Sequence, residues 1–328
     1  MRSKRVALIG LGVMGINHAR VLQKLNGVEL IAVYDSLGTS TVNQSALPLV
    51  TSIEEVIRLR PDYCVIATPT SSHETIAMTL LEHNLNVLIE KPIALDSRAS
   101  QRIIDKALEK RLVGGVGHIE RFNPALIEAK KRIDVGEIGQ VYQITSTRIG
   151  PNPQRIRDVG VSVDLATHDI DVARWLTDSE YEHISAQIFQ RSGIQKEELL
   201  CAVGKLSKGI IVNHVVNWLS PVKVRNTFIL GELGAFEVDT LNSDLILFEK
   251  GSIPVLQADL ARFKGSVEGQ KIQLSFEKPE PLLIEHQEFL NAINGLESNY
   301  VSLTSAHSNL IVAEAIVESA ANMRMVTL

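Results

Sequence analysis

Near its start the chain carries glycines in a G-x-G-x-x-G spacing, where a short apolar stretch gives way to an amphipathic pattern. They are Gly10, Gly12 and Gly15, in the sequence VALIGLGVMGINHAR, with Val13 and Met14 between them. In a strand–turn–helix unit the first glycine permits a tight turn, the second lets the main chain approach a pyrophosphate, and the third lets helix and strand pack closely. The helix N-terminus then offers N–H groups and partial positive charge. The spacing predicts a dinucleotide-binding turn.

An aspartate stands where the second strand of such a unit would end. Leu30–Tyr34 has strand character and leads directly to Asp35, twenty residues after the last glycine of the turn. At that place an acidic side chain accepts hydrogen bonds from the adenosine ribose and repels a 2′-phosphate. We therefore expect NAD as the cofactor. Ser36, Thr39 and Ser40 offer hydroxyl donors to a phosphate, which leaves NADP as the less favoured alternative.

Length and composition limit which classes of protein the chain can belong to. The chain has 328 residues, 45% hydrophobic and 22% charged, which suits two domains with separate cores. A net charge of −5 argues against nucleic acid and membrane surfaces as partners, since both favour a basic balance. No apolar run approaches the ~20 residues of a membrane span. The basic start resembles a secretion signal, but the glycines and the strand–helix pattern that follows argue against one.

Cysteine and histidine usage points to a reduced compartment and to no metal. Cys64 and Cys201 each lie in an apolar stretch, and we expect both to be buried strand residues. Without a C-x-x-C motif or a disulfide framework, reduced thiols and a cytoplasmic location are the expectation. The histidines and cysteines show no ligand spacing, so we expect no metal site.

Residues 1–120 alternate strand and helix patterns, as in a doubly wound parallel sheet of the Rossmann type. Helices are expected to begin near Met14, Ile53, Ser72 and Ser97. The expected strands are Arg5–Ile9, Leu30–Tyr34, Tyr63–Ala67, Asn86–Ile89 and Val113–Val116.

Residues 121–328 are richer in strands, which follow one another through glycine-containing turns and predict an α+β domain with a large, open, mostly antiparallel sheet. Helices are expected at Pro124–Ile133, Ile284–Ile293 and Ala306–Met323. The expected strands are Val141–Thr147, Ile184–Phe189, Leu199–Leu206, Ile210–Trp218, Val224–Leu230, Ala235–Val238 and Leu245–Phe248.

Open parallel sheets bind ligands beyond the carboxyl ends of their strands. Thr68 and Pro69 follow the third expected strand, His73 begins the next helix, and Glu90 and Lys91 follow the fourth strand. We expect all of them to contact the cofactor.

Lys91 is the sharpest candidate for chemistry. Pro92 biases it towards an extended conformation, which would hold its ammonium over the crevice at the strand end. The alternative is a solvated surface lysine, which position alone makes equally plausible.

A second group of polar residues lies on one expected helix. Asp164, His168 and Asp171 stand at i, i+4 and i+7 and would share a face, where a carboxylate can orient an imidazole as a general base. On a lone helix a solvated ion pair is the favoured alternative, and a metal site is a poor one. Asp169 falls within the apolar arc, so we expect it to be buried against a donor such as an arginine.

Three segments resemble the Gfo/Idh/MocA family of oxidoreductases: Glu90–Pro92, Gly117–Pro124 and Asp164–Asp171. The likeness covers nearly the whole chain. It implies a Rossmann domain followed by a domain built on a large open sheet, assembly into dimers or tetramers through that sheet, and a catalytic group that here would be Lys91, Asp164 and His168. The expected activity is hydride transfer from a secondary alcohol of a sugar-type substrate to NAD, with the lysine and histidine converging beside the nicotinamide.

Within the family, the GHIERFNP segment and residues 155–171 resemble enzymes that oxidise C3 of UDP-N-acetylglucosamine. This implies that Arg121 and Asn123 contact substrate. Arg148, Arg155 and Arg157 surround a proline-containing loop, and guanidinium groups suit a diphosphate. A solvated basic loop is the alternative for these arginines. An inositol or free aldose substrate, or a non-catalytic NAD-binding sensor, stays open for the chain.

Overall fold

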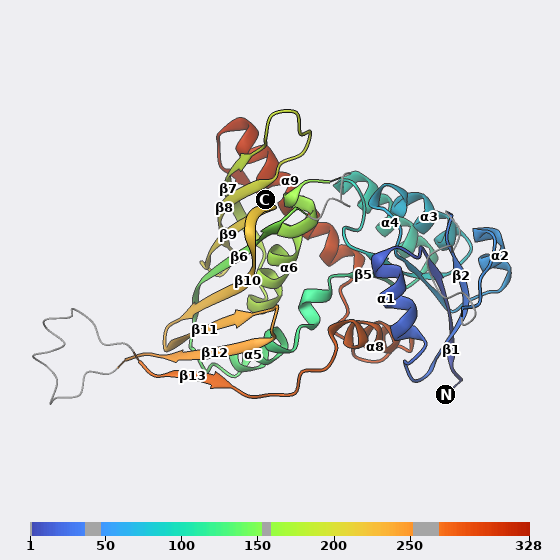
Figure 1. The fold of residues 1–328 in the computed structure, drawn as a ribbon, viewed down its shortest axis with the longest axis horizontal. Helices are drawn as coiled ribbons and strands as arrows, with labels where there is room; N and C mark the ends of the chain where they lie inside the picture. The colour runs from blue at the N-terminus through green and yellow to red at the C-terminus, as the bar shows by residue number, and fades with distance from the viewer. Residues whose placement is uncertain (1, 37–46, 153–158, 252–268) are drawn as a thin grey trace, which may run out of the picture. The chain divides into compact units, whose positions relative to one another are not determined.

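The computed structural model describes residues 2–36, 47–152, 159–251 and 269–328 (Figure 1). The chain divides into two compact units. One comprises Met1–Ile119 and Glu280–Glu314, and the other comprises Glu120–Pro279 and Ala315–Leu328. Each unit is built on one sheet.

The first unit contains a five-stranded parallel sheet in the order β2-β1-β3-β4-β5. The inner strands have continuous apolar stretches, because both faces of a parallel sheet are covered. Val6, Ala7 and Leu8, for example, are completely buried. The strands are β1 (Lys4–Ile9), β2 (Val28–Tyr34), β3 (Tyr63–Ile66), β4 (Asn86–Glu90) and β5 (Gly114–Gly117).

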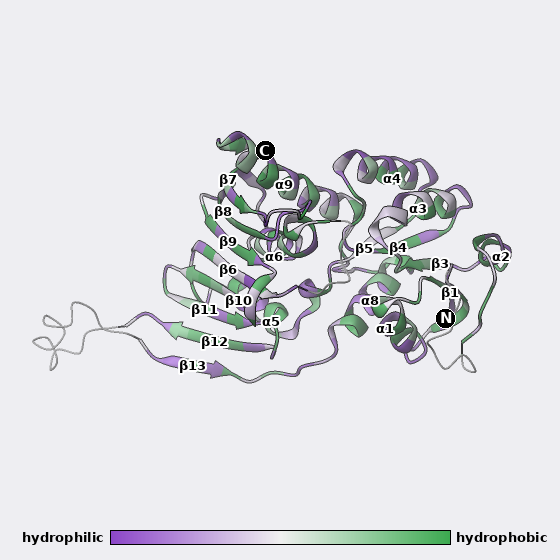
Figure 2. Ribbon diagram, turned by 45° about the horizontal axis from the view of Figure 1, so that its top comes forward, coloured by the Kyte–Doolittle hydropathy of each residue, from purple (hydrophilic) through white to green (hydrophobic). Residues whose placement is uncertain are grey.

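Helices of this unit pack on the sheet through one apolar side, and α4 shows mixed hydropathy accordingly (Figure 2). Its start is fixed by Asp96, whose side chain accepts a hydrogen bond from the Ala99 main chain. The helices are α1 (Val13–Leu22), α2 (Ile53–Arg58), α3 (His73–Glu82), α4 (Ser97–Lys110) and α8 (Pro281–Ile293), with the 3₁₀ turn η2 (Thr70–Ser72). A second 3₁₀ turn, η3 (Ile119–Phe122), begins at the last residue of the segment Met1–Ile119 and continues into the second unit.

The second unit contains a nine-stranded sheet in the order β13-β12-β11-β10-β6-β9-β8-β7-β14. Every pairing is antiparallel except that of β6 with β9. The predicted fold class, a Rossmann-type sheet followed by an open, mostly antiparallel sheet, is confirmed. The strands are β6 (Val141–Pro151), β7 (Tyr181–Phe189), β8 (Leu199–Leu206), β9 (Ile211–Asn217), β10 (Leu219–Gly231), β11 (Gly234–Asp239), β12 (Asp244–Glu249), β13 (Lys271–Leu274) and β14 (Val326–Thr327).

Helices α5 (Pro124–Asp134) and α6 (Thr167–Thr177) contact one another and the strands of this sheet. A π-helical segment, η4 (Ser162–Ala166), leads into α6. Strand residues alternate between buried and exposed, as in β8 and β9, which is typical of a sheet with only one face covered.

Two details differ from the sequence expectations. The predicted second domain, 121–328, included the helix α8, but α8 packs within the first unit, where Phe289 stacks edge-on against Tyr63 of β3. Helix α9 (Leu303–Asn322) contributes residues to both units. Such long-range packing leaves no mark on local patterning. Cys64 is buried as expected, but the expectation for Cys201 was wrong, because its side chain points to the exposed face of β8.

Within the described part of the chain, no helix is both long and apolar enough to cross a membrane.

Candidate active site

The carboxyl edge of the five-stranded sheet has the topology of a nucleotide site. Strand β1 lies between β2 and β3, so the chain changes direction across the sheet between β1 and β3. Ligands of open α/β sheets bind at such switch points. The glycine turn follows β1, and Thr68 follows β3 on the other side of the crossing point.

Each glycine of the turn has a distinct geometric role. Gly10 adopts φ = +99°, and a Cβ there would lie 2.5 Å from the carbonyl oxygen of Ala67. A Cβ on Gly15 would lie 2.0 Å from the carbonyl oxygen of Gly10, so helix and turn could not approach as they do. Around Gly12, by contrast, a Cβ would meet nothing within 4 Å. The turn therefore leaves an open cradle at Gly12, at the N-terminus of α1, where a pyrophosphate fits.

Asp35 lies directly beyond β2 and faces this turn. Its Oδ2 accepts a hydrogen bond of 2.6 Å from the main chain of Leu11. This hydrogen bond holds the Asp35 carboxylate at the rim of the glycine turn. Thr39 and Ser40, the alternative phosphate donors, lie outside the described residues.

The loop after β3 is braced by His73. The two ring nitrogens of His73 lie 2.9 Å from the carbonyl oxygens of Thr68 and Pro92. The ring therefore links the Thr68–Pro69 segment to the segment that follows β4. This bracing role was not expected from the sequence, and a cofactor contact of His73 stays a prediction.

Lys91 directly follows β4 and is half-buried. Its main-chain N–H donates to Oε2 of Glu90 at 3.1 Å, and the Lys91–Pro92 peptide bond is cis. Glu90 itself is buried, and its carboxylate lies 2.9 Å from Nε2 of His18 on α1. Lys91 therefore lies at the carboxyl edge of the sheet, and its main chain is held by the buried carboxylate of Glu90.

The second group of candidate residues lies in the other unit. Asp164 is 4% exposed and His168 is 7% exposed, so the alternative of a solvated ion pair is wrong. Asp164 belongs to the π-helical segment η4, and His168 to the first turn of α6. The sequence argument assumed one continuous α-helix and was wrong about the first turn. π-Helical turns are rare and occur frequently at functional sites.

Two arginines, the buried Arg148 and the half-buried Arg121, hold α6 in place. Arg148 on β6 donates from Nε to both oxygens of Asp169, at 3.1 and 3.0 Å, and from Nη1 to Glu120 at 2.8 Å. The predicted burial of Asp169 against an arginine is confirmed. Arg121 donates to both oxygens of Asp171, so Asp171 serves this ion pair instead of joining a group with Asp164.

Several residues expected to contact a diphosphate or the substrate make contacts within the protein. Arg148 is enclosed between two carboxylates and is not a diphosphate ligand. Asn123 caps α5 by accepting from the Ala125 main chain, and its amide donates to the carbonyl of Thr240. Arg121 and Asn123 thus have structural contacts, and their substrate contacts stay predictions. Arg155 and Arg157 lie outside the described residues.

Sequence reasoning missed Glu197. This buried carboxylate accepts hydrogen bonds from the main chain and the hydroxyl of Ser162, and so caps the segment that carries Asp164. A Cβ on Gly160 would lie 2.1 Å from the Glu197 carboxylate, so the glycine makes room for it. Glycine at 160 was the only local signal, because Glu197 is distant in sequence.

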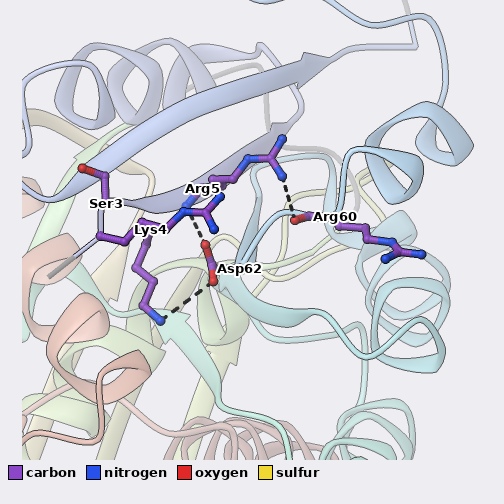
Figure 3. A pocket seen from close by; sticks show the side chains of 6 residues that line it. Ser3, Lys4, Arg5, Arg60 and Asp62 are labelled. Atoms are coloured by element: carbon purple, nitrogen blue, oxygen red, sulfur yellow. Dashed lines mark hydrogen bonds and ion pairs between the residues drawn. The ribbon is translucent and has the colours of Figure 1, made fainter.

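One surface cavity lies away from the nucleotide site. It has a volume of about 220 Å³ and lies at Ser3, Lys4, Arg5, Arg60 and Asp62 (Figure 3). These residues are at the amino end of β1 and just before β3, opposite to the glycine turn. Over the described ranges, no group of three or more His, Cys, Asp or Glu side chains is placed to hold a metal ion.

Comparisons with known proteins agree with this architecture. Residues 4–118 match the model of an oxidoreductase family with an NAD-binding Rossmann fold, and residues 126–237 match the GFO/IDH/MocA C-terminal domain. The chain is 27% identical over 293 residues to UDP-N-acetylglucosamine 3-dehydrogenase of Acidithiobacillus ferrooxidans, covering 88% of each protein. It is 32% identical over 191 residues to scyllo-inositol 2-dehydrogenase (NAD(+)) of Bacillus subtilis, covering 55% of this chain and 56% of that protein.

Solved structures show the same fold. The UDP-N-acetylglucosamine 3-dehydrogenase of Acidithiobacillus ferrooxidans superimposes with a TM-score of 0.84 at 24% identity, over 99% of this chain and all of that one. GenD2 from gentamicin A biosynthesis, solved in complex with NAD, superimposes with a TM-score of 0.83 at 21% identity, over 100% of this chain and 97% of that one.

Proposed function

The chain belongs to the Gfo/Idh/MocA family of oxidoreductases, and from that premise we propose that it oxidises a secondary alcohol of a nucleotide sugar, with C3 of UDP-N-acetylglucosamine as the first candidate. It is an NAD-dependent dehydrogenase that acts on sugar-type substrates. The observation that carries the finer proposal is the similarity to the Acidithiobacillus enzyme along 88% of the chain.

The residues of the first unit fit NAD. The cradle at Gly12 admits a pyrophosphate, and Asp35 at its rim provides a carboxylate for the ribose hydroxyls. The other proposed cofactor contacts are Gly10, Val13, Met14, Gly15, Thr68, Pro69, His73, Glu90 and Lys91. When bound, NAD accepts hydride at C4 of its nicotinamide ring.

The proposed catalytic residues divide the remaining work. His168 takes the proton of the substrate hydroxyl as its carbon loses hydride, and Asp164 orients the imidazole. Lys91 stabilises the developing alkoxide with its ammonium. The products are a ketone, reduced cofactor and one proton on His168.

Replacement of the lysine tests this scheme. We expect Lys91→Met to lower kcat by ~10²- to 10⁴-fold while NAD still binds, because a charge that acts on the alkoxide is lost. Lys110→Met is the matched control, since Lys110 lies in the last turn of α4 and pairs with Glu82 at the surface. Turnover by Lys91→Met near that of the unmodified protein would refute the role of Lys91.

A screen of UDP-sugars, inositols and free aldoses, followed by NADH absorbance, tests the substrate. An inositol is the second candidate, because several relatives are inositol 2-dehydrogenases. For a nucleotide sugar, we expect Arg155→Ala and Arg157→Ala to raise KM, and an unchanged KM would favour the smaller substrates. Tight NAD binding without turnover of any of these compounds would favour a sensor.

We also propose that the chain forms a homodimer or homotetramer through the open face of its nine-stranded sheet. Neighbouring strands of that face expose large apolar side chains, namely Tyr142, Val203, Ile211, Val215 and Leu230. Large apolar side chains exposed on adjoining strands favour association. Light scattering should show an oligomer that Val215→Glu dissociates and that Val135→Glu, at an exposed helix end, leaves intact.

A further inference from the structure

A chain of buried polar groups lies within the first unit behind Lys91. His18 on α1 is fully buried, and its Nε2 lies 2.9 Å from Oε1 of Glu90 at the end of β4. Its Nδ1 lies 2.8 Å from Nε2 of His286 on α8, which is also fully buried. Three elements that are distant in sequence thus meet at one carboxylate. Neither the dinucleotide-binding turn nor the proposed proton transfer uses these histidines.

The carboxylate is enclosed from every side. Glu90 packs against Gly117 on β5, where a Cβ would lie 3.3 Å from the carboxylate carbon, and it accepts the Lys91 main-chain N–H. The charged and titratable groups that face it are His18, Lys91, His73 and, on α8, Glu285. Burial acts to raise the pKa of Glu90, but the hydrogen bond and charge of His18, together with the charges of Lys91 and His73, outweigh it, and the pKa lies below its ordinary value.

Burial favours the neutral forms of two neighbouring groups on α8, Glu285 and His286. Burial and the nearby charge of Glu90 raise the pKa of Glu285 well above its ordinary value, and neither of its carboxylate oxygens makes a hydrogen bond within the described residues. Burial likewise lowers the pKa of His286 well below its ordinary value. An ionised Glu90 can only accept, so Nε2 of His18 must carry the hydrogen of their bond. Nδ1 of His18 then accepts from Nε2–H of His286 when the His18 ring is neutral, and donates to it only when the His18 ring is charged. Of the two buried carboxyl groups, Glu90 thus favours the ionised form and Glu285 the protonated form.

We propose that His18 and His286 are positioning residues that act through Glu90: they hold its carboxylate ionised and fixed, and so place Lys91 at the exit of β4. This inference rests on the proposed role of Lys91 in the dehydrogenase reaction. His286 orients His18, His18 donates to Glu90, and Glu90 accepts the main-chain N–H of the lysine. The network also explains why a buried histidine follows the glycine turn by one helical turn.

Infrared titration of the Glu90 carboxylate tests the network without any substrate. Glu90→Gln identifies the band. His18→Leu removes the donor, so the protonation of Glu90 should move to higher pH, whereas His18→Gln keeps an N–H in place and should restore most of the shift. His83→Leu, at an exposed position after α3, is the matched control. If His18→Leu does not fold, His286→Leu serves the same titration with a smaller shift. An unchanged titration in a folded variant would overturn the inference.

The pH profile of turnover, measured with the substrate found by the screen, links the network to catalysis. As the pH is lowered, we expect the His18→Leu variant to lose activity at a higher pH than the unmodified protein does. At neutral pH its kcat should be about tenfold lower, whereas His18→Gln should be close to the unmodified protein. His18→Leu in the Glu90→Gln background should have little further effect, because both act through one carboxylate. If Lys91→Met stays active while the Glu90 titration shifts, the lysine role fails and the network stands. If Lys91→Met is inactive and the titration is unchanged, only the network fails.

Discussion

Nε of Arg148 lies 3.1 and 3.0 Å from the two carboxylate oxygens of Asp169, and both side chains are buried. This ion pair joins β6 to α6, where Asp169 directly follows His168. The apolar side of α6 thus includes a charged anchor at its first turn. Because a buried charge must keep its partner, the anchor fixes the rotation of α6 about its axis.

Removal of the anchor should destabilise the second unit. Asp169→Leu leaves the Arg148 guanidinium with only Glu120, and breaking a buried ion pair costs about 3 kcal/mol or more. Urea unfolding measures the loss. Asp244→Leu removes the partner of Lys278 in an exposed pair and should cost less than about 1 kcal/mol. Equal losses for the two variants would contradict the anchor.

Alanine at two glycines of the turn should separate folding from cofactor binding. Gly15→Ala places a methyl group 2.0 Å from the Gly10 carbonyl oxygen and should lower the unfolding temperature. Gly12→Ala meets no protein atom within 4 Å and should leave that temperature nearly unchanged. It should nevertheless weaken NAD binding about tenfold or more, because the methyl group occupies the cradle. Calorimetry and NAD titration of both variants check the contrast.

The charge of Asp35 should set the preference between the two cofactors. Asp35→Asn keeps an oxygen to accept from Leu11, so the turn should persist, but repulsion of a 2′-phosphate disappears. We expect the ratio of NADP to NAD dissociation constants to fall about tenfold. Fluorescence titration with both cofactors measures the ratio. A ratio that stays constant in the folded variant would show that Asp35 does not discriminate.

The cap provided by Glu197 should control the segment that carries Asp164. Glu197→Leu removes the acceptor for the main chain and the hydroxyl of Ser162, and we expect a loss of about 1–3 kcal/mol in unfolding free energy. Turnover should fall while NAD affinity is retained. Glu197→Gln keeps an acceptor oxygen and should recover most of both losses. If Gln and Leu behave alike, the cap does not depend on these bonds.

Glu285 should make the protein less stable as pH rises. Its pKa is raised in the folded protein, so the folded state keeps a proton that the unfolded chain loses above its ordinary value of 4.5. Stability from this group is therefore full below that pH and is lost at up to about 1.4 kcal/mol per pH unit above it. Glu285→Gln removes the dependence, so its advantage should grow between pH 5 and 7. Parallel stability curves for the two proteins would argue against a protonated Glu285.

Local pattern was sufficient for much of the first unit. Three features depend only on neighbours along the chain: the glycine spacing, the strand ends at Asp35 and Lys91, and the run of short apolar strands. They could therefore be predicted from the sequence. The succession of strands through glycine-containing turns likewise predicted a large, mostly antiparallel sheet in the second half. The spacing of Asp164 and His168 identified the right segment but not its π-helical turn, because the cap that holds this turn comes from Glu197.

The sequence by itself determined the parallel sheet, the dinucleotide-binding turn and the identity of the polar residues at the strand ends, since each follows from short-range periodicity and backbone sterics. Only the tertiary structure decided which charges are enclosed. Arg148 meets Asp169, His18 meets Glu90 and His286, and α8 joins the first unit. Burial and pairing between distant segments set the ionisation of such groups, and no local pattern encodes which segments will meet.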